Sequence, residues 1–126
     1  MDGFQENDRI IVIGATNLFK RLDPALTRPG RFDRVIEIKV PEKQEIQEIF
    51  KIYLEKRKHQ VSDEKIEHVA QYCKGLSGAE IKNLVNLCAI EASKEAREKG
   101  ESVFCIEEPL FEAFAFGYIK NFRLKE

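Results

Sequence analysis

The sequence predicts a mostly α-helical fold in which the end of an α/β parallel sheet precedes a domain of four helices. Two short segments, residues 9–17 and 34–41, are rich in β-branched residues, as is typical of strands. After Pro41, apolar residues recur at the spacing of amphipathic helices. We therefore expect a boundary near Pro41, with an α/β part at residues 1–41 and a small helical part at residues 42–126.

The α/β part is expected to contain two strands and one short helix. Residues 9–17 are almost continuously apolar, which predicts a strand buried on both faces of a parallel sheet. Residues 34–41 alternate apolar and charged side chains, which indicates a more exposed strand that ends at proline. Between them, Asp23 and Pro24 are suited to the N-cap and first position of a short helix.

The helical part is expected to contain four helices. They should cover residues 42–58, 62–75, 77–100 and a segment from about Pro109 onward. Ser62 can cap the second helix, and the Ser-x-x-Glu sequence at residues 77–80 is a capping box for the third. Gly75 and Gly100 can end helices in a left-handed backbone. The side chains expected to face inward are Ile46, Ile49, Phe50, Tyr53, Leu54, Ile66, Val69, Ala70, Cys73, Ile81, Leu84, Val85, Cys88, Ala89, Ala92, Leu110, Phe111 and Phe114.

Composition excludes several classes of function. The net charge of −1 gives no reason to expect a nucleic-acid or acidic-membrane partner, and the predicted helices lack the basic stripe of a helical DNA-binding domain. The longest apolar run, residues 10–13, is too short to span a membrane, and the polar start does not resemble a secretory signal.

The cysteines favour an intracellular, reducing compartment. The chain has three cysteines and no C-x-x-C spacing. Cys73 and Cys88 lie at apolar helix positions, so we expect buried free thiols; a redox or metal role is the alternative. The two histidines are not spaced as a metal-binding pair, and no metal site is expected.

Asn17 and two arginines are candidate phosphate-site residues. Asn17 follows a predicted buried strand, where ligands gather in α/β sheets, and its amide can orient a water; the alternative is that it only begins a turn. Arg28 and Arg31 flank a Pro-Gly turn, and guanidinium groups bind phosphate bidentately. Their alternative role is pairing with Asp23 or Asp33.

The start of the third helix is a candidate contact for a flat ligand. Residues 75–79 read Gly-Leu-Ser-Gly-Ala, so backbone N–H groups lie near small side chains. The alternative is an ordinary capped helix that needs no ligand.

Taken together, these segments resemble the AAA family of P-loop ATPases. Residues 11–17 look like the strand with the sensor-1 asparagine. Residues 22–34 look like the second region of homology, which carries two arginine fingers, and residues 75–81 match the lid motif. The FtsH-type membrane proteases and the proteasomal ATPase subunits are nearest in pattern.

The resemblance implies a role in ATP hydrolysis by a ring, with six subunits as the expected number. Asn17 would position the attacking water or sense the γ-phosphate. Arg28 and Arg31 would reach the site of the neighbouring subunit. The ring would remodel, unfold or degrade protein substrates, in the cytoplasm or on the cytoplasmic or matrix side of a membrane.

The resemblance also implies an adenosine contact on the lid, for ATP or ADP bound with Mg²⁺ in the complete module. Gly78 and Ala79 would pack on ribose and adenine, and Ile49 and Tyr53 match positions that line the adenine pocket. Tyr53 stands where many relatives carry histidine.

Two phosphate-site motifs of the family do not occur in the sequence. The 126 residues contain neither a G-x-x-x-x-G-K-[ST] loop nor the Asp-Glu-ended strand that holds magnesium, nor a His-Glu-x-x-His pair. We therefore expect no ATPase activity from this polypeptide alone, and an exposed apolar arm at residues 10–13 beside a self-sufficient lid. The alternative function is a short, non-catalytic module that docks on intact AAA subunits.

Overall fold

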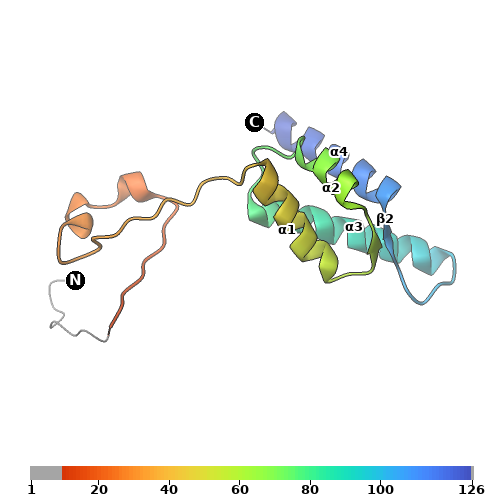
Figure 1. The fold of residues 1–126 in the computed structure, drawn as a ribbon, viewed down its shortest axis with the longest axis horizontal. Coiled ribbons are helices and arrows are strands. Elements are labelled where there is room, and N and C mark those ends of the chain that lie inside the picture. The colour runs from red at the N-terminus through yellow and green to blue at the C-terminus, as the bar shows by residue number, and fades with distance from the viewer. Residues whose placement is uncertain (1–9, 126) are drawn as a thin grey trace. The chain divides into compact units, whose positions relative to one another are not determined.

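The computed structural model describes residues 10–125 of the chain (Figure 1). The chain forms two compact units, Met1–Ile38 and Lys39–Glu126. The first contains two short 3-10 helices, η1 (Phe19–Arg21) and η2 (Pro24–Thr27). The elements of the second are α1 (Lys43–Glu55), β1 (His59–Gln60), α2 (Asp63–Ala70), α3 (Gly78–Glu98), β2 (Ile106–Glu107) and α4 (Glu108–Leu124). The mostly α-helical fold with four helices is thereby confirmed.

The two strands predicted for the first unit are not formed. The described parts of residues 9–17 and 34–41 have no regular secondary structure, and residue 9 lies outside the described residues. A strand requires a neighbour to pair its backbone groups, and neither segment has one within residues 10–125. The apolar side chains are consequently uncovered: Ile11 is 87% exposed and Ile13 is 88% exposed.

The short helix predicted at Asp23 is confirmed as η2. The Asp23 carboxylate accepts a hydrogen bond from the Ala25 backbone N–H at 2.9 Å, and Pro24 occupies the first helical position. A carboxylate at this position satisfies one of the backbone donors that a helix start leaves unpaired.

The helix starts in the second unit follow the predicted caps. The Ser62 hydroxyl accepts from the Lys65 N–H at the start of α2, and Ser77 forms the predicted capping box with Glu80. Helix α2 ends at Ala70, five residues before the predicted end at Gly75. Helix α1 begins as expected but ends at Glu55, three residues before the predicted end. The chain turns there because it must enter β1 at His59.

A two-residue parallel ladder, which the sequence did not reveal, joins the chain after α1 to the chain before α4. His59 pairs with Ile106 and Gln60 pairs with Glu107. Two residues are too few to show the alternation by which strands are recognised. Ile106 is fully buried, so the ladder anchors both connections to the core.

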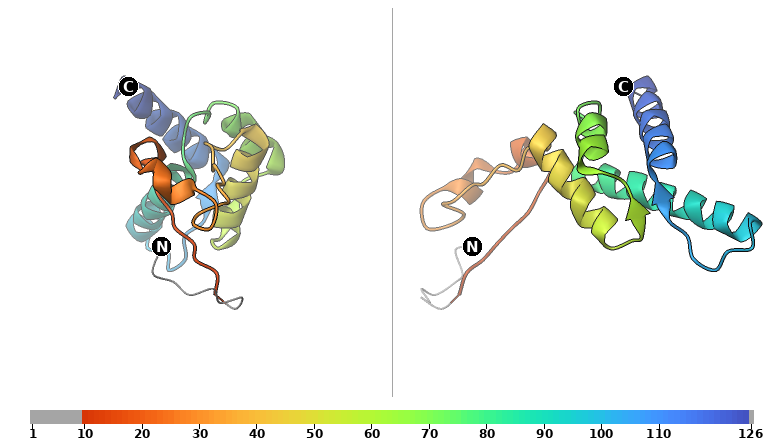
Figure 2. Two further views of the ribbon diagram at one scale, coloured as in Figure 1. Left: turned by 90° about the vertical axis from the view of Figure 1, so that its left-hand side faces the viewer. Right: turned by 45° about the vertical axis from the view of Figure 1, so that its right-hand side comes forward.

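One apolar cluster holds the four helices together. Helix α3 packs against α1 and α4, and α2 also packs against these two helices (Figure 2). Phe50 of α1 and Phe111 of α4 meet edge to face, with ring centroids 5.3 Å apart. Every side chain predicted to face inward packs in or against this cluster, although Ile49, Tyr53, Leu110 and Phe114 are only partly buried.

The predicted buried thiols are confirmed. Cys73 and Cys88 are buried and free, and burial raises the pKa of both thiols from 9.0 to about 12. Among residues 10–125, no helix combines the length and the apolarity that crossing a lipid bilayer would require.

Candidate functional site

The segment that leads to Asn17 lies beside the segment that follows the two arginines in the first unit. Asn17 is exposed, and within residues 10–125 its side chain makes no hydrogen bond. The Phe32 ring lies so close to Gly14 that a Cβ atom there would be 3.3 Å from it. The segment that leads to Asn17 therefore packs against the segment that follows the two arginines.

The Pro-Gly turn between the arginines has the geometry typical of a type II turn. The Arg31 N–H donates to the Arg28 carbonyl at 3.1 Å, and Gly30 has a φ of +84°. A Cβ atom on Gly30 would meet nothing within 4 Å, so the requirement for glycine comes from the backbone. Such a turn holds Arg28 and Arg31 close together.

The two arginines have different surroundings. Arg28 is exposed, and its guanidinium has no hydrogen-bond or ion-pair partner among the described residues, so the alternative pairing of Arg28 with Asp23 or Asp33 is not seen. Arg31 is half-buried, and its Nη1 donates to the Ala25 carbonyl at 3.0 Å. Arg28 is thus the more accessible cation of this turn.

The start of α3 offers two unpaired backbone donors. The capping box uses the N–H groups of Ser77 and Glu80, at 2.7 Å and 3.3 Å from their acceptors. The N–H groups of Gly78 and Ala79 make no hydrogen bond within residues 10–125. Ile49 of α1 lies beside them, since its Cδ1 would be 3.9 Å from a Cβ atom on Gly78. Three of the four predicted lid residues therefore meet at one place.

Tyr53, the fourth predicted lid residue, belongs to a clamp between α1 and α3. Arg57 Nη1 donates to the Tyr53 carbonyl at 2.9 Å, and Arg57 Nη2 donates to the Asn86 side-chain oxygen on α3. The Lys56 ammonium lies 5.4 Å from the centre of the Tyr53 ring. Sequence reasoning missed Arg57 and Asn86, which are 29 positions apart and carry no motif.

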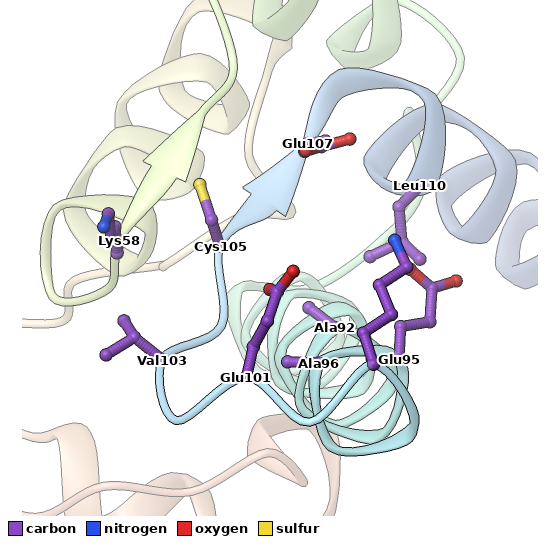
Figure 3. A pocket seen from close by; sticks show the side chains of 10 residues that line it. Lys58, Ala92, Glu95, Ala96, Glu101, Val103, Cys105, Glu107 and Leu110 are labelled. Carbon is purple, nitrogen blue, oxygen red and sulfur yellow. The ribbon is translucent and has the colours of Figure 1, made fainter.

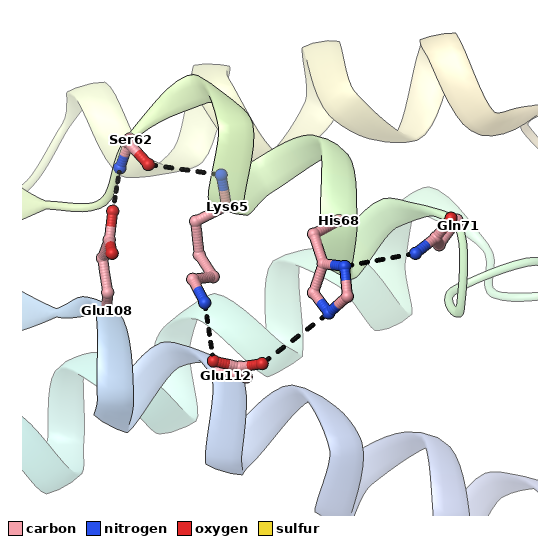
Figure 4. A network of polar contacts seen from close by, with 6 residues as sticks. All are labelled: Ser62, Lys65, His68, Gln71, Glu108 and Glu112. Carbon is pink, nitrogen blue, oxygen red and sulfur yellow. Dashed lines mark hydrogen bonds and ion pairs between the residues drawn. The ribbon is translucent and has the colours of Figure 1, made fainter.

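A polar network joins α2 to α4 on the surface of the second unit (Figure 4). Glu108 accepts from the Ser62 backbone N–H at 2.8 Å, which lowers the pKa of its carboxyl group. Lys65 donates to Glu112 at 2.8 Å, which raises the pKa of Lys65, and His68 lies 3.8 Å from the same carboxylate. None of the predicted site residues belongs to this network, which fastens α4 to α2.

A small polar pocket lies between the β1–β2 ladder and the end of α3 (Figure 3). Its lining includes Lys58, Glu95, Glu101, Cys105 and Glu107. None of the residues predicted to contact a nucleotide lines this pocket, so it is distinct from the candidate lid contact at the start of α3.

Two family models match this chain. The model of the ATPase family associated with various cellular activities (AAA) matches residues 1–40, and the model of the AAA+ lid domain matches residues 63–104. The two matches follow one another in the chain and together cover more than half of it. The chain belongs to the AAA family.

Within the family, the chain is similar to FtsH-type proteases and to proteasomal nucleotidases. It is 48% identical over 99 residues to the ATP-dependent zinc metalloprotease FTSH 9, chloroplastic/mitochondrial, of Oryza sativa subsp. japonica. The same identity and length relate it to the FTSH 11 protease of Arabidopsis thaliana. It is 46% identical over 100 residues to the proteasome-activating nucleotidase of Saccharolobus islandicus.

These alignments cover most of this chain and a small part of each relative. Each covers 79% of this chain, but only 12% of the two plant proteases and 25% of the archaeal nucleotidase. The chain thus spans about an eighth of the plant relatives and a quarter of the archaeal one.

Proposed function

We propose that this chain supplies the sensor, arginine-finger and lid portion of an AAA ATPase that acts on protein substrates as a ring of subunits. The observation that carries the proposal is the Arg28–Arg31 turn, which exposes the Arg28 guanidinium without a hydrogen-bond or ion-pair partner among residues 10–125, in a segment matched by the AAA model. A cation exposed in this way is available to a phosphate on another subunit.

In this proposal, Asn17 and the arginines act on the phosphate end of the nucleotide. The Asn17 amide can hold a water through one donor and one acceptor without adding charge. The arginine segment supplies positive charge that stabilises the negative charge of phosphoryl transfer, a contribution of roughly 10³–10⁵ in rate in related systems.

The lid residues act on the other end of the nucleotide. The Gly78 and Ala79 N–H groups and the Ile49 side chain suit contact with the adenosine of ATP or ADP, because they combine unpaired donors with an apolar surface. The Tyr53 ring is placed on the same helix as Ile49, one turn further along. Magnesium and the phosphate loop would be supplied by residues other than these 126.

The second candidate function is a non-catalytic module that docks on intact AAA subunits. It is favoured by the exposed apolar side chains of residues 10–13 and 35–40, which are suited to pairing with strands of another chain. Such a module would supply arginines to a ring without completing a site of its own.

The thiols support the proposed compartment. Buried, unpaired Cys73 and Cys88 fit a reducing, intracellular location, in the cytoplasm or on the cytoplasmic or matrix side of a membrane.

The test is an ATPase assay with an intact FtsH-type subunit whose own arginine pair has been replaced. Adding this chain should restore hydrolysis, and the double substitution Arg28→Ala with Arg31→Ala should abolish the effect. Arg21→Ala, at an exposed cation in the same unit, is the matched control and should stimulate like the unaltered chain. No stimulation by a chain that is folded by circular dichroism would contradict the enzymatic role and favour the docking module.

A further inference from the structure

The Ala25 carbonyl connects the arginine pair to η2. It accepts a long hydrogen bond of 3.4 Å from the Arg28 backbone N–H and a shorter one of 3.0 Å from Arg31 Nη1. Arg31 therefore caps the end of η2, and Arg28 is the residue that directly follows this helix. A guanidinium donor at a helix end satisfies a carbonyl that would otherwise lack a strong partner.

Two backbone hydrogen bonds also stabilise this turn. The Phe32 N–H donates to the Leu26 carbonyl at 2.9 Å, and the Arg31 N–H donates to the Arg28 carbonyl at 3.1 Å. The side chain of Arg31 is half-buried against the Ala25 carbonyl, whereas that of Arg28 is exposed to solvent.

We infer that the two arginines have separate roles, in which Arg28 contacts phosphate and Arg31 is a positioning residue that holds η2 and the turn so that Arg28 is presented. The identity of the anion that Arg28 contacts rests on the proposed function, whereas the positioning role of Arg31 concerns this chain alone. It predicts unequal effects for substitutions that sequence reasoning treats as equivalent.

Substitution by lysine distinguishes the two roles, because they place different demands on the side chain. A bond to one carbonyl needs a cationic N–H donor, which lysine also has, so Arg31→Lys should preserve the cap in part. Bidentate contact with phosphate needs the planar guanidinium fork, so Arg28→Lys should not replace arginine.

The first measurement uses NMR on the 126-residue chain without nucleotide. Arg31→Ala should shift the Ala25 carbonyl ¹³C resonance and accelerate exchange of the Phe32 amide about fivefold, the factor that corresponds to one hydrogen bond of about 1 kcal/mol. Arg31→Lys should recover part of both changes, and Arg28→Ala, the matched control, should produce neither. The inference is overturned if Arg31→Ala leaves both signals unchanged, or if Arg28→Ala changes them equally.

The second measurement uses the stimulated ATPase assay with the same variants and with Arg28→Lys. Both Arg28→Ala and Arg28→Lys should lower the stimulated kcat about a hundredfold or more, with KM little changed. Arg31→Ala should lower it less, and Arg31→Lys should recover at least half of the loss. Equal losses for both alanine variants without rescue by lysine would overturn the separation of roles. If the unaltered chain itself gives no stimulation, the proposed function fails, and the NMR result still decides whether Arg31 positions the turn.

Discussion

Gly75 and Gly117 of the second unit differ in backbone conformation. Gly75 has a φ of +96°, and a Cβ atom added there would lie 3.9 Å from the Phe122 ring. Gly117 lies inside α4, where an added Cβ atom would meet nothing within 4 Å. We expect Gly75→Ala to lower the free energy of unfolding by about 1 kcal/mol, and Gly117→Ala to raise it by about 0.5–1 kcal/mol. Urea unfolding of both variants measures these changes, and effects of equal sign would contradict the expectation.

The thiols provide a second prediction for individual residues. Cys105 is half-buried, whereas Cys73 and Cys88 are buried. A thiol reagent at a pH of about 8 should label one cysteine rapidly, and the other two only when the protein unfolds. Cys105→Ser should remove the rapid phase. Rapid labelling of more than one thiol in the folded chain would show that the core is open.

The pH dependence of stability follows from the same thiols. Their folded pKa of about 12 lies above the unfolded value of 9.0, so the unfolded chain releases protons that the folded chain retains. Their contribution to the free energy of unfolding is therefore complete below the unfolded pKa of 9.0 and is lost as the pH rises toward about 12. The raised pKa of Lys65 acts in the same direction, above its ordinary value of 10.5.

At the scale of elements, the clamp from Arg57 joins the end of α1 to α3. We expect Arg57→Met, which keeps an aliphatic stem without donors, to lower the free energy of unfolding by about 1–2 kcal/mol, because Asn86 and the Tyr53 carbonyl lose their partner. Lys56→Met is the matched control and should change it by less than about 0.5 kcal/mol. In a double-mutant cycle, Arg57→Met and Asn86→Ala should be coupled by at least about 0.5 kcal/mol. Strict additivity would show that the clamp contributes nothing.

The contact of Glu108, at the start of α4, with Ser62, at the start of α2, makes the stability of this helix pair sensitive to acid. The pKa of the Glu108 carboxyl group is lowered from 4.5, mainly by hydrogen bonding to Ser62. Its contribution to the free energy of unfolding is therefore present above pH 4.5 and is lost as the pH falls through the folded pKa. Glu108→Gln should flatten the decline in stability at acid pH. Glu107→Gln, at the neighbouring exposed position, should leave the decline unchanged. Identical pH profiles for Glu108→Gln and the unaltered chain would refute this role.

The elements show where sequence reasoning succeeds. The caps at Ser62 and Ser77 could be predicted because each cap bonds within three residues of itself. The strand predictions failed although the composition of residues 10–13 is that of a strand, because pairing depends on a neighbour and not on composition. The β1–β2 ladder could not be anticipated, because its two strands are 47 positions apart and each is only two residues long.

For the molecule as a whole, the two units differ in how well they cover their apolar residues. The helices of Lys39–Glu126 share one buried cluster, whereas residues 10–13 remain exposed. Limited proteolysis should therefore cleave residues 10–41 first and leave residues 43–118 protected. A polypeptide of residues 39–126 should unfold with the same free energy as the full chain. Early cleavage within residues 43–118 would contradict a self-sufficient helical unit.

Local chemistry in the sequence determined the helices, their starts, the residues that face the core and the AAA motifs, because each depends on neighbours within a few positions. Tertiary structure alone decided the β1–β2 ladder, the Arg57–Asn86 clamp and the fastening of α4 to α2, because their partners are distant in sequence. It also separated the surroundings of Arg28 and Arg31, which look alike in the sequence. The physical reason is that a side chain chooses its hydrogen-bond partner from what the folded chain places beside it, and for Arg31 one such partner is the Ala25 carbonyl.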